Sequence, residues 1–374
     1  MRPMRITVID PPDYTPPYDH ALCAALARRG LDVELVTSPF RHGPVPPPDG
    51  YRRREAFYRH GSGGRALKLV QHPFDMLRLA RELRQQENGI THFQWLPVPL
   101  LDLRLVSRFP RPRVLTAHDL PRTSTPWSEP QARALARHID AAVVHSDDGR
   151  RRLVTDLGFP DSNVRVIPHG VFDYLTRLPE ERPLDPGVGD LDGRKVVLSF
   201  GLIRPYKGID VLIEAFAAAP PDSVLLVVGR AMMPIEPFRR RAQELGLGDR
   251  VRFVTRFITD PEIPAYFRRA DLVVLPYREI EQSGVLFTAL AFGCPLVLSA
   301  VGGFTEIGER HKAARLVPPG HAEALGHALA ELLNDDAARA GLAAAARRAA
   351  AGPYSWDSVA EETSRLYEEL LGQP

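Results

Sequence analysis

The segment SFGLIRPYKGIDVLIEAF (199–216) places two cations and two glycines in one short turn between a predicted strand and a predicted helix. The apolar run before this turn is typical of a buried strand and ends at Gly201. Glycine lets a ligand approach the main chain, and the first N–H groups of the following helix carry partial positive charge. Arg204 and Lys207 add two full charges, so the turn predicts a site for a phosphate or a diphosphate. The alternative is that both cations are solvated loop residues.

A second strand-to-helix turn lies within DLVVLPYREIEQSGVLFTALAFG (271–293) and is expected to form another wall of the same site. A helix is predicted to begin there, and its first N–H groups would point toward a bound anion. Carboxylates repel phosphates but accept hydrogen bonds from sugar hydroxyls. The candidates are the main chain of Ser283, Gly284 and Val285 for a phosphate, and the side chains of Glu279 and Glu281 for a sugar.

The elements that must position these residues alternate between short apolar strands and amphipathic helices. The predicted strands are 6–10, 33–37, 90–93, 113–117, 141–145 and 164–168 in the first half, and 195–200, 223–229, 250–255, 271–276 and 295–299 in the second. Continuous apolar strands are typical of parallel sheets with helices on both faces. The fold class is therefore α/β, with two Rossmann-like doubly wound domains, and a ligand is expected in a cleft where the carboxyl ends of their strands face each other.

The domain boundary is predicted at 177–194, where proline, glycine and acidic residues replace the apolar pattern. This gives one domain at 1–180 and a second at 190–352. A last helix within 354–374 has apolar residues at a spacing of three or four, and we expect it to pack back onto the first domain.

The composition is that of a globular two-domain protein: 374 residues, 44% hydrophobic, 25% charged, with a net charge of +2 at pH 7. So small a net charge gives no indication of nucleic-acid binding. Cys23 and Cys294 are isolated from each other, which excludes a disulfide framework and favours reduced, buried thiols in a cytoplasmic protein. No apolar stretch is long enough to span a membrane, so any membrane contact is expected to be peripheral.

Several motifs resemble, in order and spacing, the retaining glycosyltransferases of family 4 (group 1), which have the GT-B fold. GLIRPYKGIDVLIEAF resembles the Gly-x-x-x-x-x-Lys-Gly segment of this family. EQSGVLFTALAFGCPLVLSAVGGFTEI resembles its Glu-x-Phe-Gly...Glu-Ala-x-Ala-x-Gly-x-Pro-Val segment. Weaker matches, in the expected order, are TAHDL (116–120), AAVVHS (141–146) and VRVIPHGV (164–171). The resemblance covers nearly the whole chain.

The resemblance implies an enzyme of the hexosyltransferase type, which moves a sugar from a nucleoside diphosphate to a hydroxyl acceptor with retention and needs neither a metal nor a cofactor. It assigns the acceptor to the first domain and the donor to the second. Arg204 and Lys207 would bind the diphosphate beside Gly201 and stabilise its charge as it leaves. Glu279 or Glu281 would hold the donor sugar.

Three histidines follow predicted strands of the first domain. His118, in the polar turn after 113–117, would by the same resemblance lie near the anomeric carbon and the acceptor. His169 is a further candidate on the acceptor side, and His145 is a weaker one. For all three the alternative is a hydrogen-bonded histidine at a strand end.

The chain departs from the family pattern in two places. Thr288 stands where a second glutamate commonly binds the nucleoside ribose, which leaves the nucleoside open. The glycine-rich loop after the first strand is replaced by PPDYTPPYDHAL (11–22). Here Tyr14, Tyr18 and Asp19 are candidates for contact with the acceptor, and the alternative is a rigid proline-rich loop.

The segment 41–70 has seven Arg or Lys against two Asp or Glu, interleaved with aromatic residues. It is interpreted as a peripheral membrane contact, with an anionic acceptor or a solvated loop as alternatives. The Asp-x-Asp of 190–192 lies in the predicted linker, so a turn is preferred to a metal site. Two other functions remain open: a nucleotide-sugar 2-epimerase with the same fold, and a non-catalytic nucleotide-sugar-binding module.

Overall fold

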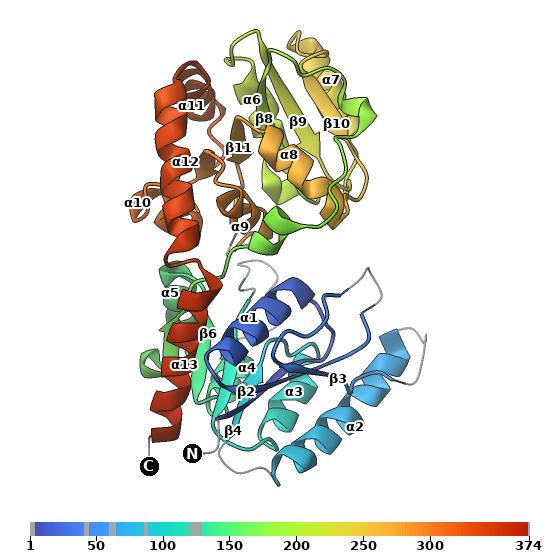
Figure 1. Ribbon diagram of the computed structural model, residues 1–374, viewed down its shortest axis with the longest axis vertical. Coiled ribbons are helices and arrows are strands. Elements are labelled where there is room, and N and C mark those ends of the chain that lie inside the picture. The colour runs from blue at the N-terminus through green and yellow to red at the C-terminus, as the bar shows by residue number, and fades with distance from the viewer. Residues whose placement is uncertain are drawn as a thin grey trace. The chain divides into compact units, whose positions relative to one another are not determined.

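The computed structural model describes residues 4–40, 45–59, 65–85, 89–118, 120, 129–280 and 282–372 (Figure 1). The chain divides into two compact units. Unit 1 is Met1–Gly170 with Ser355–Pro374, and unit 2 is Val171–Tyr354. Each unit is built on one parallel β-sheet, as the apolar strands predicted.

Unit 1 has its strands in the order β3-β2-β1-β4-β5-β6-β7. The strands are β1 (Arg5–Asp10), β2 (Asp32–Thr37), β3 (Arg52–Glu55), β4 (Gly89–Phe93), β5 (Arg113–Thr116), β6 (Ala141–Val144) and β7 (Val164–Val166). The helices are α1 (Pro16–Arg28), α2 (Arg65–Leu83), α3 (Pro99–Val106), α4 (Glu129–Ala136), α5 (Asp147–Thr155) and α13 (Trp356–Gly372).

Helices cover both faces of this sheet because successive strand residues point to opposite sides. Ile6 and Val8 of β1 pack with α1 and α13, whereas Ile9 packs with α2, α3 and α4 on the other face. On the first face, Tyr367 of α13 has its hydroxyl 2.6 Å from Nδ1 of His92 on β4. The C-terminal helix thus belongs to unit 1.

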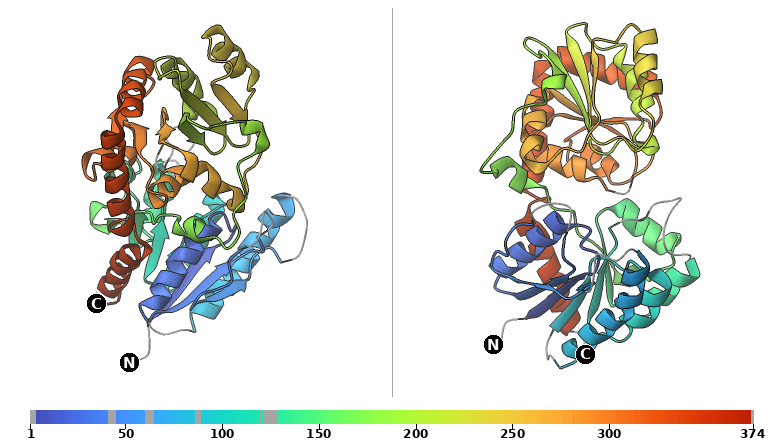
Figure 2. Two further views of the ribbon diagram at one scale, coloured as in Figure 1. Left: turned by 45° about the horizontal axis from the view of Figure 1, so that its top comes forward. Right: turned by 90° about the vertical axis from the view of Figure 1, so that its right-hand side faces the viewer.

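Unit 2 has the strand order β10-β9-β8-β11-β12-β13. The strands are β8 (Lys195–Phe200), β9 (Ser223–Val228), β10 (Val251–Val254), β11 (Leu272–Leu275), β12 (Leu296–Ser299) and β13 (Arg315–Val317). The helices are α6 (Ile209–Phe216), α7 (Glu236–Glu244), α8 (Ile263–Arg269), α9 (Gly284–Ala291), α10 (Phe304–Glu309), α11 (Ala322–Asn334) and α12 (Asp336–Ala351). One face packs against α6, α7 and α11, and the other against α8, α9, α10 and α12; Figure 2 shows the helices on both sides.

Two strands were not predicted from the sequence. β3 consists of three arginines and a glutamate and pairs with β2 at the edge of its sheet. β13 is three residues long and pairs only with β12 among the strands described. Edge strands need little apolar character because neighbouring elements cover them less, and so the apolar pattern did not reveal these two.

The polar segment 177–194 does not separate the two units, since the division falls between Gly170 and Val171. Val188 and Leu191, within the segment, lie in the core of unit 2, and a guanidinium N–H of Arg252 on β10 donates to the carbonyl of Asp190 (2.8 Å). Two apolar residues among many polar ones are therefore enough to fix this segment on the sheet.

In both sheets the order in which the chain adds strands reverses at one point, between β1 and β4 in unit 1 and between β8 and β11 in unit 2. The loops leaving the carboxyl ends of these strands diverge to opposite faces and leave room for a ligand. Among the residues described, no helix is long and apolar enough to cross a membrane.

Candidate functional site

In unit 2 the chain leaves β8 through a turn that only glycine can make. Gly201 has φ +96°, and a Cβ on it would lie 2.8 Å from Nζ of Lys207 and 3.0 Å from a methyl carbon of Val285. Gly208, with φ +67°, precedes α6, and a Cβ there would lie 2.1 Å from the carbonyl oxygen of Pro276. The two glycines therefore bring Lys207, α6 and the first turn of α9 close together.

Lys207 is only 6% exposed although its side chain is charged. Its Nζ donates to the carbonyl oxygen of Phe200 (3.3 Å) and lies 5.0 Å from the centre of the Tyr277 ring. Among the residues described, no carboxylate lies within ion-pair distance of this ammonium group. Burial, assisted by the charge of Arg204, lowers the pKa of Lys207 to about 8. A cation held in this way is poised for an anion that comes from outside the protein.

Arg278 links the turn after β8 to the turn after β11 in unit 2. Its guanidinium pairs with Asp210 in the first turn of α6 and donates to the carbonyl oxygen of Pro205 (3.0 Å). Its main-chain N–H donates to the carbonyl oxygen of Tyr206 (2.7 Å). Arg204 itself is exposed, so its guanidinium is accessible to a ligand.

The first turn of α9 supplies the other wall of this site. Ser283 precedes the helix and is buried, while Gly284 and Val285 form its first positions. The first N–H groups of a helix have no partner within it, and α9 begins beside Gly201 and Lys207. The predicted phosphate-binding segments, 201–208 and 283–285, are thus brought together in one unit.

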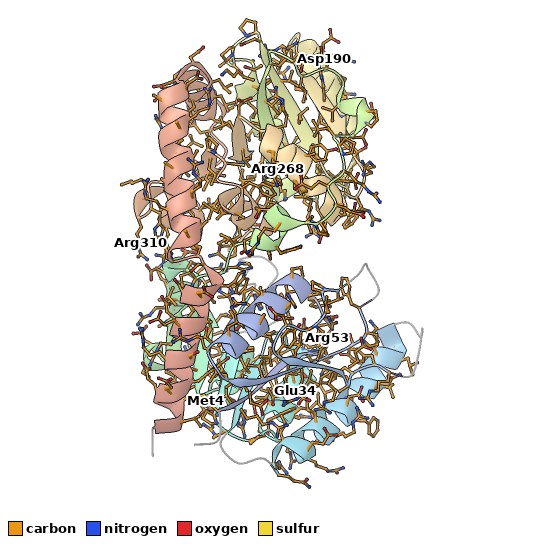
Figure 3. All side chains as sticks on the ribbon, viewed as in Figure 1. Met4, Glu34, Arg53, Asp190, Arg268 and Arg310 are labelled. Carbon is orange, nitrogen blue, oxygen red and sulfur yellow. The ribbon has the colours of Figure 1, made fainter. Side chains whose placement is uncertain are left out.

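The residues predicted to bind the sugar and the nucleoside differ in their exposure. Thr288 is buried, and its hydroxyl donates to the carbonyl oxygen of Gly284 (2.9 Å), so toward a ligand it can only accept. Glu279 is exposed in the turn after β11. Glu281 lies outside the residues described. The Asp-x-Asp motif forms a turn, since Asp190 accepts from the N–H of Asp192 (2.9 Å), at the sheet edge where β8 begins. Figure 3 labels Asp190.

In unit 1, polar side chains gather where β1, β4, β5, β6 and β7 end. His118 follows β5 and is surrounded by aromatic rings: Trp95 is stacked on it at 5.1 Å between ring centres, and Tyr18 meets it edge-on at 4.7 Å. His145 and His169, after β6 and β7, complete the group. Burial lowers the pKa of His118 well below its ordinary value, and it lowers the pKa of His145 to about 4 and of His169 to about 3. All three imidazoles are therefore neutral near pH 7.

The three acceptor-side candidates of the first loop have different places. Tyr14 is 63% exposed and meets Trp95 edge-on at 5.4 Å, so its ring is accessible. Tyr18 is 3% exposed among the histidines. Asp19 is fully buried, beneath the loop and not on its surface. The second half of this proline-rich segment forms α1, beginning at Pro16.

Asp19 belongs to a buried carboxyl cluster with Asp10 and Asp13, whose oxygens lie within 4.8 Å of one another. Asp10 accepts from the main-chain N–H groups of Asp13 (3.1 Å) and Tyr14 (2.8 Å), and Asp13 pairs with Arg53 (2.8 Å). Burial raises the pKa of Asp10 to about 6 and that of Asp19 well above its ordinary value. The cluster therefore holds protons at mildly acidic pH and fixes the loop.

Residues 41–44 and 60–64 of the basic segment 41–70 lie outside the part described. Its three consecutive arginines on β3 are paired with acidic neighbours, among them Arg52 with Asp32 (2.8 Å) and Arg54 with Glu82 (2.8 Å). Its aromatic residues are buried in unit 1: Phe57 and Tyr58 pack in the core with α2, and Tyr51 packs on the opposite face of the sheet with α1 and α13. The exposed apolar residues lie on α2 instead, at Leu67, Leu69, Val70 and Phe74.

Sequence reasoning did not identify four residues of these sites: Gln94, Trp95, Tyr277 and Arg278. Each directly follows or closely follows a strand next to the point where the strand order reverses. Their position just after β4 or β11 was therefore the feature of the sequence that could have identified them as site residues. Cys23 and Cys294 are free and buried, as the sequence predicted.

Two family models match the chain. The model described as glycosyltransferase family 4 matches residues 18–172, and that described as glycosyl transferases group 1 matches residues 183–349. A phosphatidyl-myo-inositol mannosyltransferase of Mycobacterium leprae is 30% identical over 82% of this chain and 80% of its own length. A D-inositol 3-phosphate glycosyltransferase of Mycobacterium tuberculosis is 25% identical over 93% of this chain and 77% of its own length.

Solved structures share the fold over nearly the whole chain. Anabaena HepE in complex with UDP has a TM-score of 0.74 at 18% identity, covering 98% of this chain and 100% of its own. Sucrose-phosphate synthase from Thermosynechococcus elongatus has a TM-score of 0.73 at 23% identity, covering 98% and 99%. The predicted GT-B fold is confirmed.

Proposed function

Because the chain belongs to the group 1, family 4 glycosyltransferases, we propose that it transfers a hexosyl group from a nucleoside diphosphate sugar to a hydroxyl acceptor, with retention and without a metal ion. The observation that carries the donor assignment is the buried ammonium group of Lys207, which has no carboxylate partner among the described residues. HepE has been solved in complex with UDP and with UDP-glucose, and this likeness supports a nucleotide-sugar donor.

The diphosphate would bind where Lys207, Arg204 and the first turns of α6 and α9 converge. Two side-chain cations and two helix N-termini are enough to offset its charge, which supports a mechanism that needs no metal. Breaking the bond between the anomeric carbon and the phosphate oxygen sends the electron pair to the diphosphate. Lys207 and Arg204 stabilise that negative charge as it develops.

The acceptor hydroxyl would attack the anomeric carbon on the face that the diphosphate leaves, which gives retention. Its proton passes to an oxygen of the departing diphosphate, so the step yields the glycoside and the nucleoside diphosphate. His118, Tyr14 and His169 are the proposed acceptor-side residues of unit 1. The names of the two mycobacterial relatives support an acceptor with several hydroxyl groups, as in inositol.

We also propose that α2 brings unit 1 to a membrane surface from the cytoplasm. Its exposed side chains at Leu67, Val70 and Phe74 lie along one side of the helix at a spacing of three and four. Lys68 adds an exposed cation beside them, which suits anionic lipid head groups. The contact is peripheral in this proposal.

The membrane proposal is tested by sedimentation with phosphatidylcholine vesicles, with and without phosphatidylserine. The double variant Val70→Ser/Phe74→Ser is expected to lose binding, whereas Leu100→Ser, which removes a 67% exposed leucine of α3, should not. Equal loss in both variants, or no binding by the unchanged protein, would contradict a role for α2.

Transfer is tested by incubating the protein with UDP-glucose or GDP-mannose, alone and with myo-inositol or its phosphate, and analysing the products. Lys207→Ala should abolish turnover while the protein stays folded, and Lys195→Ala, at the surface beside Asp336, should not. Conversion of a donor to its epimer without an acceptor would favour an epimerase. Donor binding without any turnover over a wide acceptor panel would favour a binding module.

A further inference from the structure

His118 lies in the middle of a row of hydrogen-bonding groups within unit 1. Its Nδ1 is 3.3 Å from Nε2 of His145, and its Nε2 is 2.7 Å from the carboxamide of Gln94. His145 has its Nδ1 2.9 Å from the carbonyl oxygen of Ile167. Gln94 is 1% exposed and His145 is 4% exposed, so water has little access to these contacts.

If the imidazoles of His118 and His145 each carry one proton, only one arrangement of these protons makes all three contacts hydrogen bonds. The carbonyl of Ile167 can only accept, so His145 carries its single proton on Nδ1 and its Nε2 is an acceptor. Nδ1 of His118 must then donate to His145, which leaves Nε2 of His118 without a proton. In any other arrangement of neutral rings, at least one pair of lone pairs faces each other at hydrogen-bond distance.

The carboxamide of Gln94 can be oriented to fit this assignment of protons. When its oxygen faces His118, its amide nitrogen is buried and has no hydrogen-bond partner. A turn of 180° about the last side-chain bond exchanges the two ends, which have nearly the same shape, and lets the amide donate to Nε2 of His118. This exchange leaves a carbonyl unpaired in place of an N–H, which is the smaller cost.

The surroundings hold both rings in place. Trp95 is nearly parallel to His118, with 17° between the ring planes, and Tyr18 is perpendicular to it at 89°. A partial rotation of the His118 ring would disturb both ring contacts, and a half turn would remove Nδ1 and Nε2 from His145 and Gln94. Since burial keeps both imidazoles neutral, no second proton is available to change the pattern.

We propose that His145 and Gln94 are positioning residues that hold His118 as its Nδ1-protonated tautomer. The catalytic consequence rests on the proposed function. Nε2 of His118 is the atom that accepts a hydrogen bond from a hydroxyl of the donor sugar or the acceptor, and the amide of Gln94 occupies it until the ligand arrives. With the proton on Nε2, His118 could only donate to the oxygen of that hydroxyl and could not accept its hydrogen.

Nitrogen-15 NMR of the protein with labelled histidines tests the tautomer directly, without donor or acceptor. His118 is expected to show a protonated Nδ1 and an unprotonated Nε2. His72 is an internal reference of the opposite kind, since its Nε2 lies 2.6 Å from the carboxylate of Asp102, which needs a proton there. A wild-type His118 with its proton on Nε2 would overturn the inference, whether or not the protein transfers sugar.

Two substitutions of His145 separate positioning from simple structural support. His145→Gln keeps an acceptor near the place of Nε2 and should preserve the tautomer of His118. His145→Phe removes it, so the proton should move to Nε2 and donate to the oxygen of Gln94. We expect His145→Phe to lower kcat roughly 10-fold with a smaller change in the KM of the donor, the scale of one lost hydrogen bond, and His145→Gln to recover most of this loss.

An unchanged His118 tautomer in folded His145→Phe would overturn the role of His145. Gln94→Met gives a second measurement if His145→Phe does not fold. In this variant His118 should keep its proton on Nδ1, because His145 still accepts it, while the signal of Nε2 shifts as its hydrogen bond is lost. An unshifted Nε2 signal would overturn the role of Gln94. If the spectra agree but His145→Phe transfers sugar at the normal rate, the placement of His118 in the catalytic site fails and the tautomer assignment stands.

Discussion

Replacing Lys207 with methionine is expected to stabilise the donor-free protein while it destroys donor binding. Methionine keeps the length of the side chain and removes the charge that unit 2 buries at 6% exposure. An ammonium group loses hydration when it is buried and regains it only from partners, and here the partners are one carbonyl oxygen and one ring face. The folded protein therefore bears a cost that the diphosphate would relieve.

The size of this cost follows from the pKa. Burial lowers the pKa of Lys207 from 10.5 to about 8, and at about 1.36 kcal/mol per unit this corresponds to about 3 kcal/mol. The variant also loses the hydrogen bond to Phe200, worth about 1 kcal/mol, so a net gain of about 2 kcal/mol is expected at pH 7. Between pH 8 and 10.5 the unfolded chain holds the proton and the folded chain does not. The free energy of unfolding of the wild type should therefore rise with pH across this interval, and the gap to the variant should close.

Urea unfolding of both proteins at pH 7 and pH 10, with and without UDP, measures these differences. The transition to follow is the one that UDP shifts, since two units need not unfold together. Saturating UDP, at 100 times its dissociation constant, should stabilise the wild type by about 2.7 kcal/mol and the variant much less. Lys195→Met is the matched control, because its ammonium group lies near the surface beside Asp336 (3.1 Å) and its loss should change stability by less than about 1 kcal/mol. A variant that is less stable than the wild type at pH 7, or a gap that does not change with pH, would refute the reasoning.

Three further predictions concern other parts of the two units. Gly201→Ala should lower UDP affinity and cost more than about 1 kcal/mol of stability, because its Cβ would meet Lys207 at a φ of +96°; calorimetric titration and urea unfolding would show this, and normal affinity would contradict it. Asp19→Asn should stabilise the protein at pH 7, because burial raises the pKa of Asp19 and its ionised form is disfavoured; the advantage should shrink as the pH falls toward 4 in thermal unfolding, and a larger gain at acid pH would refute the explanation. Tyr367→Phe should cost about 1 kcal/mol by removing the buried hydrogen bond to His92, and a neutral result would show that this bond contributes no net stability.

Much of the fold was predictable because its strands are buried on both faces and therefore leave continuous apolar runs in the sequence. β8 and β9 begin where expected and end within one residue of the prediction. β3 was not predictable in this way, since its arginines are stabilised by acidic partners on other elements, such as Glu82 on α2. The segment 177–194 has the composition of a linker, yet Val188 and Leu191 fix it in unit 2.

The proximity of the two turns in unit 2 could also be predicted from the sequence. A glycine and a lysine between a strand and a helix predicted that Gly201 and Lys207 lie together, and they do. The exposure of individual side chains could not be predicted from the sequence in the same way. Tyr14 is exposed and Tyr18 and Asp19 are buried, although all three lie within six residues of one proline-rich segment.

Local pattern and spacing were enough to predict the two parallel sheets, the family and the two strand-to-helix turns of the proposed donor site. The tertiary structure was needed to establish which charges are paired and which are left for a ligand, because partners such as Arg278 and Asp210, or Arg53 and Asp13, are far apart in the chain. It also decided the protonation of His118. The tautomer of an imidazole is set by the groups that face its two nitrogens, and Gln94 and His145 reach them from different strands.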